Sequence, residues 1–226
     1  MSTQSPRGMS LPCFSPEVAG VRSLLWLPVA PACNMRCFTC TRRADRAADS
    51  FGQGTSLPPD DAVARATAAV ERGDDVSGVL LWGPGEPLVN ASTYVVLRKL
   101  QWFYPDLPVT VCTNGILLPD RLEELVRTGV SRLVLSINAV TPEAAERIYE
   151  SVNYRARQYS GKAAADLVLQ QQWNGLENAV EAGLSVTVYT AVMDGINAQE
   201  VNDISTRAKK IGAERVVTAA LQENGP

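Results

Sequence analysis

The chain of 226 residues contains no histidine. Imidazole bases, Ser-His-Asp hydrolysis, Cys-His nucleophiles and every histidine-ligated zinc or haem site are therefore excluded. Any chemistry that the chain performs must come from carboxylates, thiolates, lysine or a bound cofactor.

Long apolar runs and basic runs are also missing. The first ten residues lack the apolar stretch of a secretion signal. The longest apolar run, Leu24–Ala32, is too short to span a bilayer and contains two prolines. The net charge is −3 and no basic cluster is present, so the electrostatic footprint of a nucleic-acid-binding protein is missing. We therefore expect a cytoplasmic protein that binds neither membrane nor nucleic acid.

The composition that remains is that of an ordinary globular protein. Hydrophobic residues make up 46% of the chain and charged residues 20%, which argues against disorder and collagen-like repeats. The length suits one domain with a substantial core. We predict a single domain over residues 1–226, in which 1–23 form an N-terminal extension and 24–221 form the core.

Strand-like and helix-like segments alternate from residue 24 onward. The expected strands are Leu24–Val29, Val79–Trp82, Val109–Cys112, Arg132–Asn138, Leu184–Met193 and Arg215–Thr218. The expected helices are Pro59–Arg72, Ala91–Tyr104, Pro119–Thr128, Pro142–Tyr149, Leu167–Ala182 and Gln199–Ile211. This alternation predicts an α/β fold with a parallel sheet and right-handed crossovers. If the sheet curls, it forms a partial TIM-like barrel, whose active site should lie at the carboxyl ends of the strands. A flat doubly wound sheet fits the same pattern.

Five cysteines without a secretion signal favour metal or redox use over disulfides. Cys33, Cys37 and Cys40 lie in the loop after the first expected strand. Their spacing suits three corners of a [4Fe–4S] cubane and leaves the fourth iron open, unlike the four-thiolate clusters of ferredoxins. An open iron can chelate the amino and carboxylate groups of S-adenosylmethionine (SAM), whose reductive cleavage yields a 5′-deoxyadenosyl radical. The alternatives are a buried cysteine-rich loop and a four-thiolate zinc site that also uses Cys13 or Cys112.

Polar residues and glycines lie at the ends of the next three expected strands, where they would meet the cysteine loop. The candidate SAM-binding residues are Gly83, Gly85, Glu86, Thr113, Asn114, Ser136 and Asn138. Glycine lets the backbone approach a ligand, a carboxylate pairs with the SAM ammonium, and hydroxyls and amides suit its ribose and carboxylate. Each residue alone is better explained by a turn or a helix cap, but three such strand ends at one barrel rim favour SAM. No catalytic residue is assigned.

At these residues the chain resembles the radical SAM superfamily, whose signature is Cys-x3-Cys-x2-Cys after the first strand. More narrowly it resembles the NifB family of nitrogenase cofactor maturation proteins, from about residue 11 to residue 221. The shared motifs are LPCFS at 11–15, PVAPACN at 28–34, GPGEPL at 83–88, TNG at 113–115, INA at 137–139, IY at 148–149 and QQQ-x-x-GLE at 170–177.

The resemblance implies a partial TIM-like (β/α)6 barrel that binds a [4Fe–4S] cluster and SAM. In that family two further four-iron clusters are substrates, which are fused with a SAM-derived carbon and added sulfur into an eight-iron precursor. The resemblance also implies reduced ferredoxin or flavodoxin as the electron donor, and iron–sulfur assembly proteins as further partners.

The chain departs from the family where the accessory clusters are bound. Leu11 replaces a histidine, Arg46 replaces a cysteine after an aspartate, Thr110 replaces a strand cysteine, and the chain stops at Pro226 before a usual cysteine pair. Only Cys13 and Cys112 are left as spare thiolates, and Cys112 shares a strand face with Thr110. Two thiolates predict at most one weakly held extra cluster.

Three functions follow from these residues. The first is a NifB-like radical SAM enzyme that works in, or derives from, iron–sulfur cofactor assembly. The second keeps the cluster and SAM but acts on a peptide or a small organic molecule, since the accessory ligands are missing. The third is a non-catalytic iron–sulfur or zinc scaffold.

Overall fold

The computed structural model describes residues 24–38, 40, 56–74 and 76–220. Its centre is a six-stranded sheet with the order β1-β3-β4-β5-β8-β9, in which every neighbouring pair is parallel. The strands are β1 (Leu24–Ala30), β3 (Gly78–Pro84), β4 (Val109–Thr113), β5 (Val130–Ser136), β8 (Ser185–Val192) and β9 (Arg215–Ala220). These are the six strands that the sequence predicts, displaced by one or two residues at most ends. All six carboxyl ends therefore lie at one edge of the sheet.

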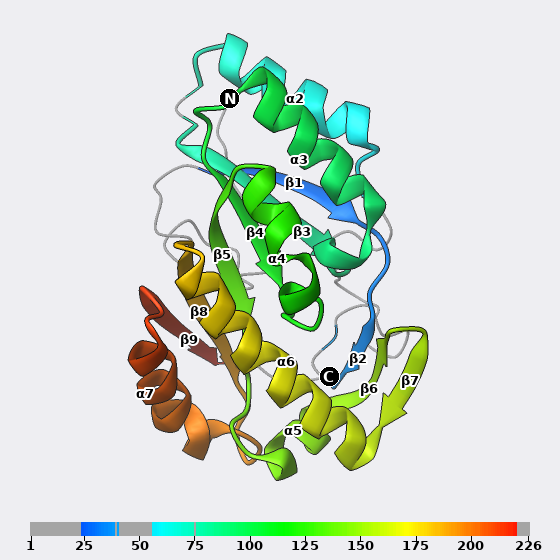
Figure 1. The fold of residues 1–226 in the computed structure, drawn as a ribbon, viewed down its shortest axis with the longest axis vertical. Helices are drawn as coiled ribbons and strands as arrows, with labels where there is room; N and C mark the ends of the chain where they lie inside the picture. The colour runs from blue at the N-terminus through cyan, green and yellow to red at the C-terminus, as the bar shows by residue number, and fades with distance from the viewer. Residues whose placement is uncertain (1–23, 39, 41–55, 75, 221–226) are drawn as a thin grey trace, which may run out of the picture.

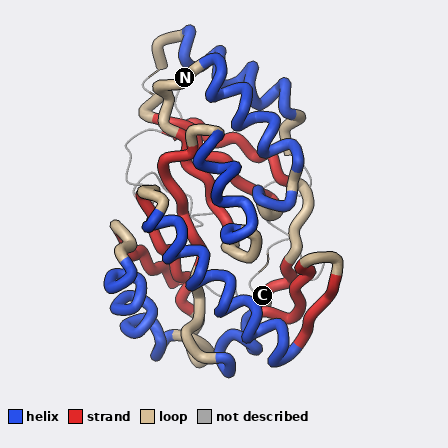
Figure 2. Tube along the Cα trace, in the orientation of Figure 1, coloured by secondary structure: helices blue, strands red, loops and turns tan. Residues whose placement is uncertain are grey.

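Helices cover one face of this sheet. They are α2 (Pro59–Glu71), α3 (Ala91–Phe103), α4 (Leu118–Arg127), α5 (Pro142–Ile148), α6 (Gly161–Glu181) and α7 (Val201–Ile211), with short 3-10 turns η3 (Pro87–Val89) and η4 (Ala198–Glu200). Figure 1 shows α2, α3, α4 and α6 on the viewer's side of the strands, and Figure 2 shows the same single layer of helices. Within the described residues, no helix is both long and apolar enough to cross a bilayer.

Both faces of the central strands are apolar, as expected for a parallel sheet. Val111, Leu133 and Val188 pack with the helices in the main core, whereas Cys112 and Val134 belong to a second cluster on the opposite face. Alternate residues of each strand thus point to the two faces. Pro28 lies within β1 because β1 is an edge strand, where a missing backbone donor is tolerated.

A second, antiparallel sheet has the order β2-β6-β7 and was not expected from the sequence. It consists of β2 (Met35–Cys37), β6 (Tyr149–Tyr154) and β7 (Arg157–Ser160). Its hairpin turn places Arg155 and Ala156 at positive φ, 48° and 60°. Such turns normally carry Asn-Gly or similar pairs, so an Arg-Ala turn gives no recognisable signal in the sequence. Helix α6 follows directly and begins six residues before its predicted start.

Candidate functional site

The cysteine loop is fixed by the small antiparallel sheet. Cys37 ends β2 and is paired with Tyr149 of β6, and the Phe38 amide donates to the Ile148 carbonyl at 2.8 Å. The Cys40 amide then donates to the Cys37 carbonyl at 3.1 Å, which turns the chain back toward the strand. These contacts hold the second and third cysteines of the motif on one short, well-anchored turn.

The three thiols of the motif are neighbours. Burial raises the pKa of the Cys37 thiol far above its usual range, and the charges of Cys33 and Cys40 raise it further. Glu150 and Glu86 add smaller contributions of the same sign. A half-buried thiol beside two other sulfurs is ionised readily only when a cationic group binds the set, which is what the irons of a cluster provide. The donor set therefore fits an iron–sulfur cubane.

The geometry differs from that of a single-ion site. Within the described residues, no three Cys, Asp or Glu side chains gather as one metal ion would require. A four-iron cubane requires less convergence, because each thiolate binds a different iron atom.

Gly85 is required by the contact between the cysteine loop and the end of β3. A Cβ at this position would lie 2.1 Å from the Ala32 carbonyl oxygen and 2.9 Å from that of Ala30. The backbones meet here through two hydrogen bonds, from Gly85 N to Ala30 O at 2.6 Å and from Glu86 N to Ala32 O at 2.8 Å. Gly83 is required by the same turn, since its Cβ would lie 2.9 Å from the Gly85 nitrogen. Any contact of these glycines with SAM stays a prediction.

Asn90 reinforces the same junction from the start of α3. Its side-chain amide donates to the Ala32 carbonyl at 2.9 Å and to the Glu86 carbonyl at 2.7 Å, and its oxygen accepts from the Ala32 amide at 3.2 Å. Asn90 thus binds both the N–H and the C=O of Ala32, the residue just before Cys33.

The Glu86 carboxylate lies buried between the ends of β3 and β4. Oε1 accepts hydrogen bonds from the Thr113 hydroxyl at 2.6 Å and the Leu88 amide at 3.0 Å, and Oε2 accepts from the Asn114 amide at 2.7 Å. Burial raises the pKa of Glu86 to about 7, although these three donors lower it. One acceptor position on Oε2 remains for a further donor. The sequence predicts Glu86 as a SAM ligand; the structure gives it a second role as a link between two strand ends.

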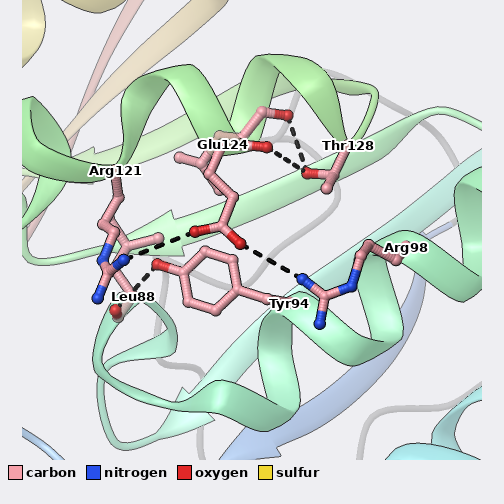
Figure 3. Close-up of polar contacts among 7 residues, drawn as sticks. Leu88, Tyr94, Arg98, Arg121, Glu124 and Thr128 are labelled. Carbon is pink, nitrogen blue, oxygen red and sulfur yellow. Dashed lines mark hydrogen bonds and ion pairs between the residues drawn. The ribbon is translucent and has the colours of Figure 1, made fainter.

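Helices α3 and α4 hold this link in place from outside. Figure 3 shows the Tyr94 ring between Arg121 and Arg98, with its hydroxyl donating to the Leu88 carbonyl at 3.0 Å. Arg121 lies 5.5 Å from the ring centroid, and Glu124 pairs with Arg98 at 3.3 Å and with Arg121 at 3.6 Å. The turn that caps Glu86 is therefore tied to the helical layer.

Asn114 connects the end of β4 to the cysteine loop and to α6. Its side-chain amide donates to the Asn34 oxygen at 2.9 Å, and its carbonyl accepts from the Gln172 amide, also at 2.9 Å. The same Gln172 nitrogen donates to the Ser136 carbonyl at 2.9 Å. One buried glutamine thus joins the carboxyl ends of β4 and β5.

Asn138 is used largely by the fold. Its side-chain oxygen accepts from the Ala191 amide at 2.9 Å, and its carbonyl accepts from the Asn197 side chain at 2.8 Å. These bonds join the segment after β5 to β8. Contacts of Ser136 and Asn138 with SAM stay predictions.

Tyr149 lies where the cysteine loop, the end of β5 and α6 meet. Its burial raises the pKa of its hydroxyl, the charge of Cys37 raises it further, and the neighbouring Gln172 and Asn138 lower it. Neither Tyr149 nor Gln172 is among the residues that the sequence singles out individually. Their only sequence signal is membership of two motifs, Ile-Tyr and Gln-Gln-Gln, which resemble an ordinary strand start and helix face.

The two cysteines predicted for an extra cluster, Cys13 and Cys112, are not brought beside the cysteine loop by the described residues. Cys112 is buried on the face of the sheet away from the helices, with Leu80 and Val134, whereas Cys33 and Cys37 pack against the cluster around Met35. Cys13, Leu11 and residues 41–55 lie outside the described residues.

The chain is similar to known proteins over most of its length. The Radical SAM superfamily model matches residues 27–208. The FeMo cofactor biosynthesis protein NifB of Chlorobaculum tepidum is 32% identical over 206 residues, which is 90% of this chain and 49% of that protein. The same protein of Klebsiella pneumoniae is 31% identical over 89% of this chain and 44% of its own length, and that of Azotobacter vinelandii is 32% identical over 89% and 41%. The chain thus spans less than half the length of these relatives.

Solved structures agree on the fold. Streptococcus suis SuiB superposes with a TM-score of 0.63 at 15% identity, over 89% of this chain and 40% of that one. Native anSMEcpe with bound AdoMet superposes with a TM-score of 0.59 at 18% identity, over 88% and 52%. The α/β fold is thus a partial TIM-like barrel, as predicted. With most of its length matched, the chain belongs to the Radical SAM superfamily of enzymes, and its cofactors are a [4Fe–4S] cluster and S-adenosylmethionine.

Proposed function

We propose that the chain is a NifB-like radical SAM enzyme core that acts in iron–sulfur cofactor assembly for nitrogen fixation, or descends from such an enzyme. The observation that carries the proposal is the set of three neighbouring thiols, held by β2 beside the carboxyl ends of β3, β4 and β5. The identity to NifB over about nine-tenths of the chain supports the narrower assignment.

Cys33, Cys37 and Cys40 hold the cluster in this proposal. Together the cluster and SAM supply a 5′-deoxyadenosyl radical by one-electron reduction of the sulfonium. The half-buried setting of the thiols limits water at the site, and the turn anchored on Ile148 fixes the spacing of the last two. The domain then comprises a barrel core over 24–221, preceded by the extension 1–23.

The other predicted residues form the rim for SAM. Glu86 offers its remaining Oε2 acceptor position to the SAM ammonium, while its other bonds keep the ends of β3 and β4 together. Thr113 and Asn114 orient that carboxylate, and Ser136 and Asn138 lie at the end of the next strand. Gly83 and Gly85 let the rim approach the cysteine loop.

The first experiment is anaerobic reconstitution with iron and sulfide. We expect about four irons per chain, reductive cleavage of SAM to 5′-deoxyadenosine, and loss of both in Cys37→Ala. Cys112→Ala is the matched control and should keep both, because Cys112 lies in a different cluster of side chains. A reconstituted chain with neither iron nor SAM cleavage would falsify the proposal.

A second function is favoured by Thr110, which occupies the place of a family cysteine. In that case the chain uses the same cofactors on a peptide or small organic substrate. Retention of about eight or more irons that depend on Cys13 would exclude this reading. A third function, a scaffold without catalysis, would be indicated by zinc in place of iron or by a cluster that does not cleave SAM.

The electron donor in this proposal is reduced ferredoxin or flavodoxin, with iron–sulfur assembly proteins as further partners. SAM cleavage should therefore be supported by either reduced protein as well as by a chemical reductant.

A further inference from the structure

A row of side chains crosses the inner face of the central sheet, which is the face away from the helices in Figure 1. Its members are register partners on five successive strands of the sheet, β1, β3, β4, β5 and β8: Trp26, Leu80, Thr110, Arg132 and Ser185. Leu80 belongs to the apolar cluster of the inner face, and partners in register share a face, so Thr110 and Arg132 lie on it too. Neighbouring strands are about 5 Å apart, so these two residues are adjacent.

The two polar residues in the middle of the row contain buried atoms that have no hydrogen-bond partner. Thr110 is 1% exposed, and its hydroxyl makes no hydrogen bond to the part of the chain that the structure describes. The Nη1 atom of the Arg132 guanidinium is equally buried and equally without a partner there. Arginine keeps its charge in proteins, and a buried charge is costly unless an opposite charge pairs with it. Two such groups on adjacent strands therefore indicate a site for an anion.

The surrounding strands supply positive rather than negative charge. Arg215 lies two residues before Val217, which packs against the same apolar cluster, so Arg215 adds a second cation to the inner face. Glu214 binds the hydroxyl of Ser185, the next member of the row. None of the ion pairs among the described residues includes Arg132. A carboxylate that would neutralise Arg132 is thus missing from those residues.

The donors suit a carboxylate or a phosphate, and the row continues into an apolar wall. A guanidinium binds either group through two parallel N–H donors, and a hydroxyl adds a third. Trp26 belongs to the same row, and its ring centroid lies 6.1 Å from that of Trp82. Thr110 precedes Thr113, the residue that binds Glu86, by three positions, so it lies about 10 Å below the carboxyl ends of the strands. An elongated organic anion bound at Thr110 would therefore extend toward the predicted active site.

We propose that Thr110 and Arg132 bind the carboxylate or phosphate group of a small organic ligand that lies along the inner face of the sheet. Oxyanion donors then occupy the place where the family carries a strand cysteine, because Thr110 replaces that cysteine. The inference goes beyond the proposed function, since the site requires neither the cluster nor SAM. A ligand of this class would be an organic substrate rather than an iron–sulfur cluster.

The test uses two probes, inorganic phosphate and benzoate, titrated into the reconstituted chain by calorimetry. We expect saturable binding of one probe per chain, and the tighter of the two identifies the ligand as a phosphate or a carboxylic acid. Arg132→Gln removes the positive charge and should weaken this binding more than tenfold. Arg127→Gln makes the same change of charge at an exposed arginine and should leave the affinity unchanged.

Thr110→Val is the second variant, and it separates ligand binding from folding. It removes a buried hydroxyl without a partner, so we expect the melting temperature of the ligand-free protein to rise by about 3 °C while the probe binds about fivefold more weakly. Thr93→Val is the matched control, because the Thr93 hydroxyl in α3 is also buried without a partner in the described residues. It should raise the melting temperature similarly and leave the affinity unchanged.

The two variants together decide the inference. Failure of both probes to bind saturably, or wild-type affinity in Arg132→Gln, overturns it. If Arg132→Gln does not fold, Thr110→Val decides, and wild-type affinity or a lower melting temperature in that variant overturns the inference. Iron content and SAM cleavage are measured on the same preparations. Their absence alongside normal probe binding defeats the proposed function and leaves this site in place.

Discussion

At the scale of single residues, the site depends on a carboxylate that is buried and yet accepts three hydrogen bonds. Glu86 has its pKa raised to about 7 from an ordinary 4.5, because burial outweighs the donors around it. The folded chain therefore binds this proton more tightly than the unfolded chain does, and the carboxylate is ionised in the folded state only above about pH 7.

This shift predicts a pH dependence of stability. Because the pKa of Glu86 is raised in the folded state, the protonated side chain stabilises the fold. This contribution to the unfolding free energy is fully present below pH 4.5 and is lost as the pH rises through 7. We expect the unfolding free energy of the wild type, relative to Glu86→Gln, to fall by about 3 kcal/mol across this window. Urea unfolding of the cluster-free protein at several pH values measures the difference. A difference that is flat with pH would show that Glu86 titrates normally.

Gly85 gives a second prediction at this scale. An alanine at this position would place its Cβ against the backbone oxygens of Ala32 and Ala30, which cannot move without separating β1 from the end of β3. We expect Gly85→Ala to lower the unfolding free energy by about 3 kcal/mol and to reduce iron uptake. Gly73→Ala is the control, since nothing lies within 4 Å of its added Cβ and only its positive φ is strained. Equal effects of the two variants would contradict the close approach.

At the scale of elements, the antiparallel hairpin that anchors the cysteine loop contains strain. Arg155 and Ala156 both adopt positive φ. The side chain of Arg155 makes an ion pair with Asp120 at 2.8 Å and contacts the Tyr154 ring, and these contacts offset the strain at that residue. We expect Ala156→Gly to raise the unfolding free energy by about 1 kcal/mol, because glycine removes the Cβ clash at this φ.

Thermal unfolding of the two proteins measures this effect. The matched control is Ala144→Gly in α5, where the same substitution is expected to destabilise by about 1 kcal/mol since the residue is helical and buried. A hairpin variant that is destabilised like the helix variant would mean that the turn is not strained.

The elements also show what sequence can predict. The six parallel strands and their helices are confirmed, because the strands are rich in apolar and β-branched residues and the helices have a periodic apolar face, as in Val109–Thr113 and α2. The small antiparallel sheet is not predictable from the pattern, because its turn carries Arg-Ala and β2 has only three residues.

The same limit applies to the site. The cysteines follow from spacing alone, since a cluster motif is local in sequence. Gln172 acts across 58 residues on Asn114 and 36 residues on Ser136, and its sequence surroundings are those of any amphipathic helix. Contacts of this length become visible only when the strand ends are brought together by the fold.

At the scale of the whole molecule, the cysteines belong to two separate clusters of side chains. Cys33 and Cys37 pack against the cluster formed by α5, α6 and β6, whereas Cys112 lies among apolar side chains on the face of the central sheet away from the helices. The neighbouring Thr110, on the same face of β4, has a buried hydroxyl without a hydrogen bond in the described part of the chain. Among the six strands of the central sheet, only β4 contains a cysteine, and that cysteine is Cys112.

A single thiol in apolar surroundings provides too few ligands to bind an accessory cluster stably. We expect desalted, reconstituted wild type to retain about four irons, and Cys112→Ser to retain the same number, since a stable cubane needs three or four thiolates. The measurement is iron and sulfide content with Mössbauer spectra, before and after gel filtration. Retention of about eight irons by the wild type and about four by Cys112→Ser would contradict the expectation. It would also mean that cluster substrates bind to this chain itself.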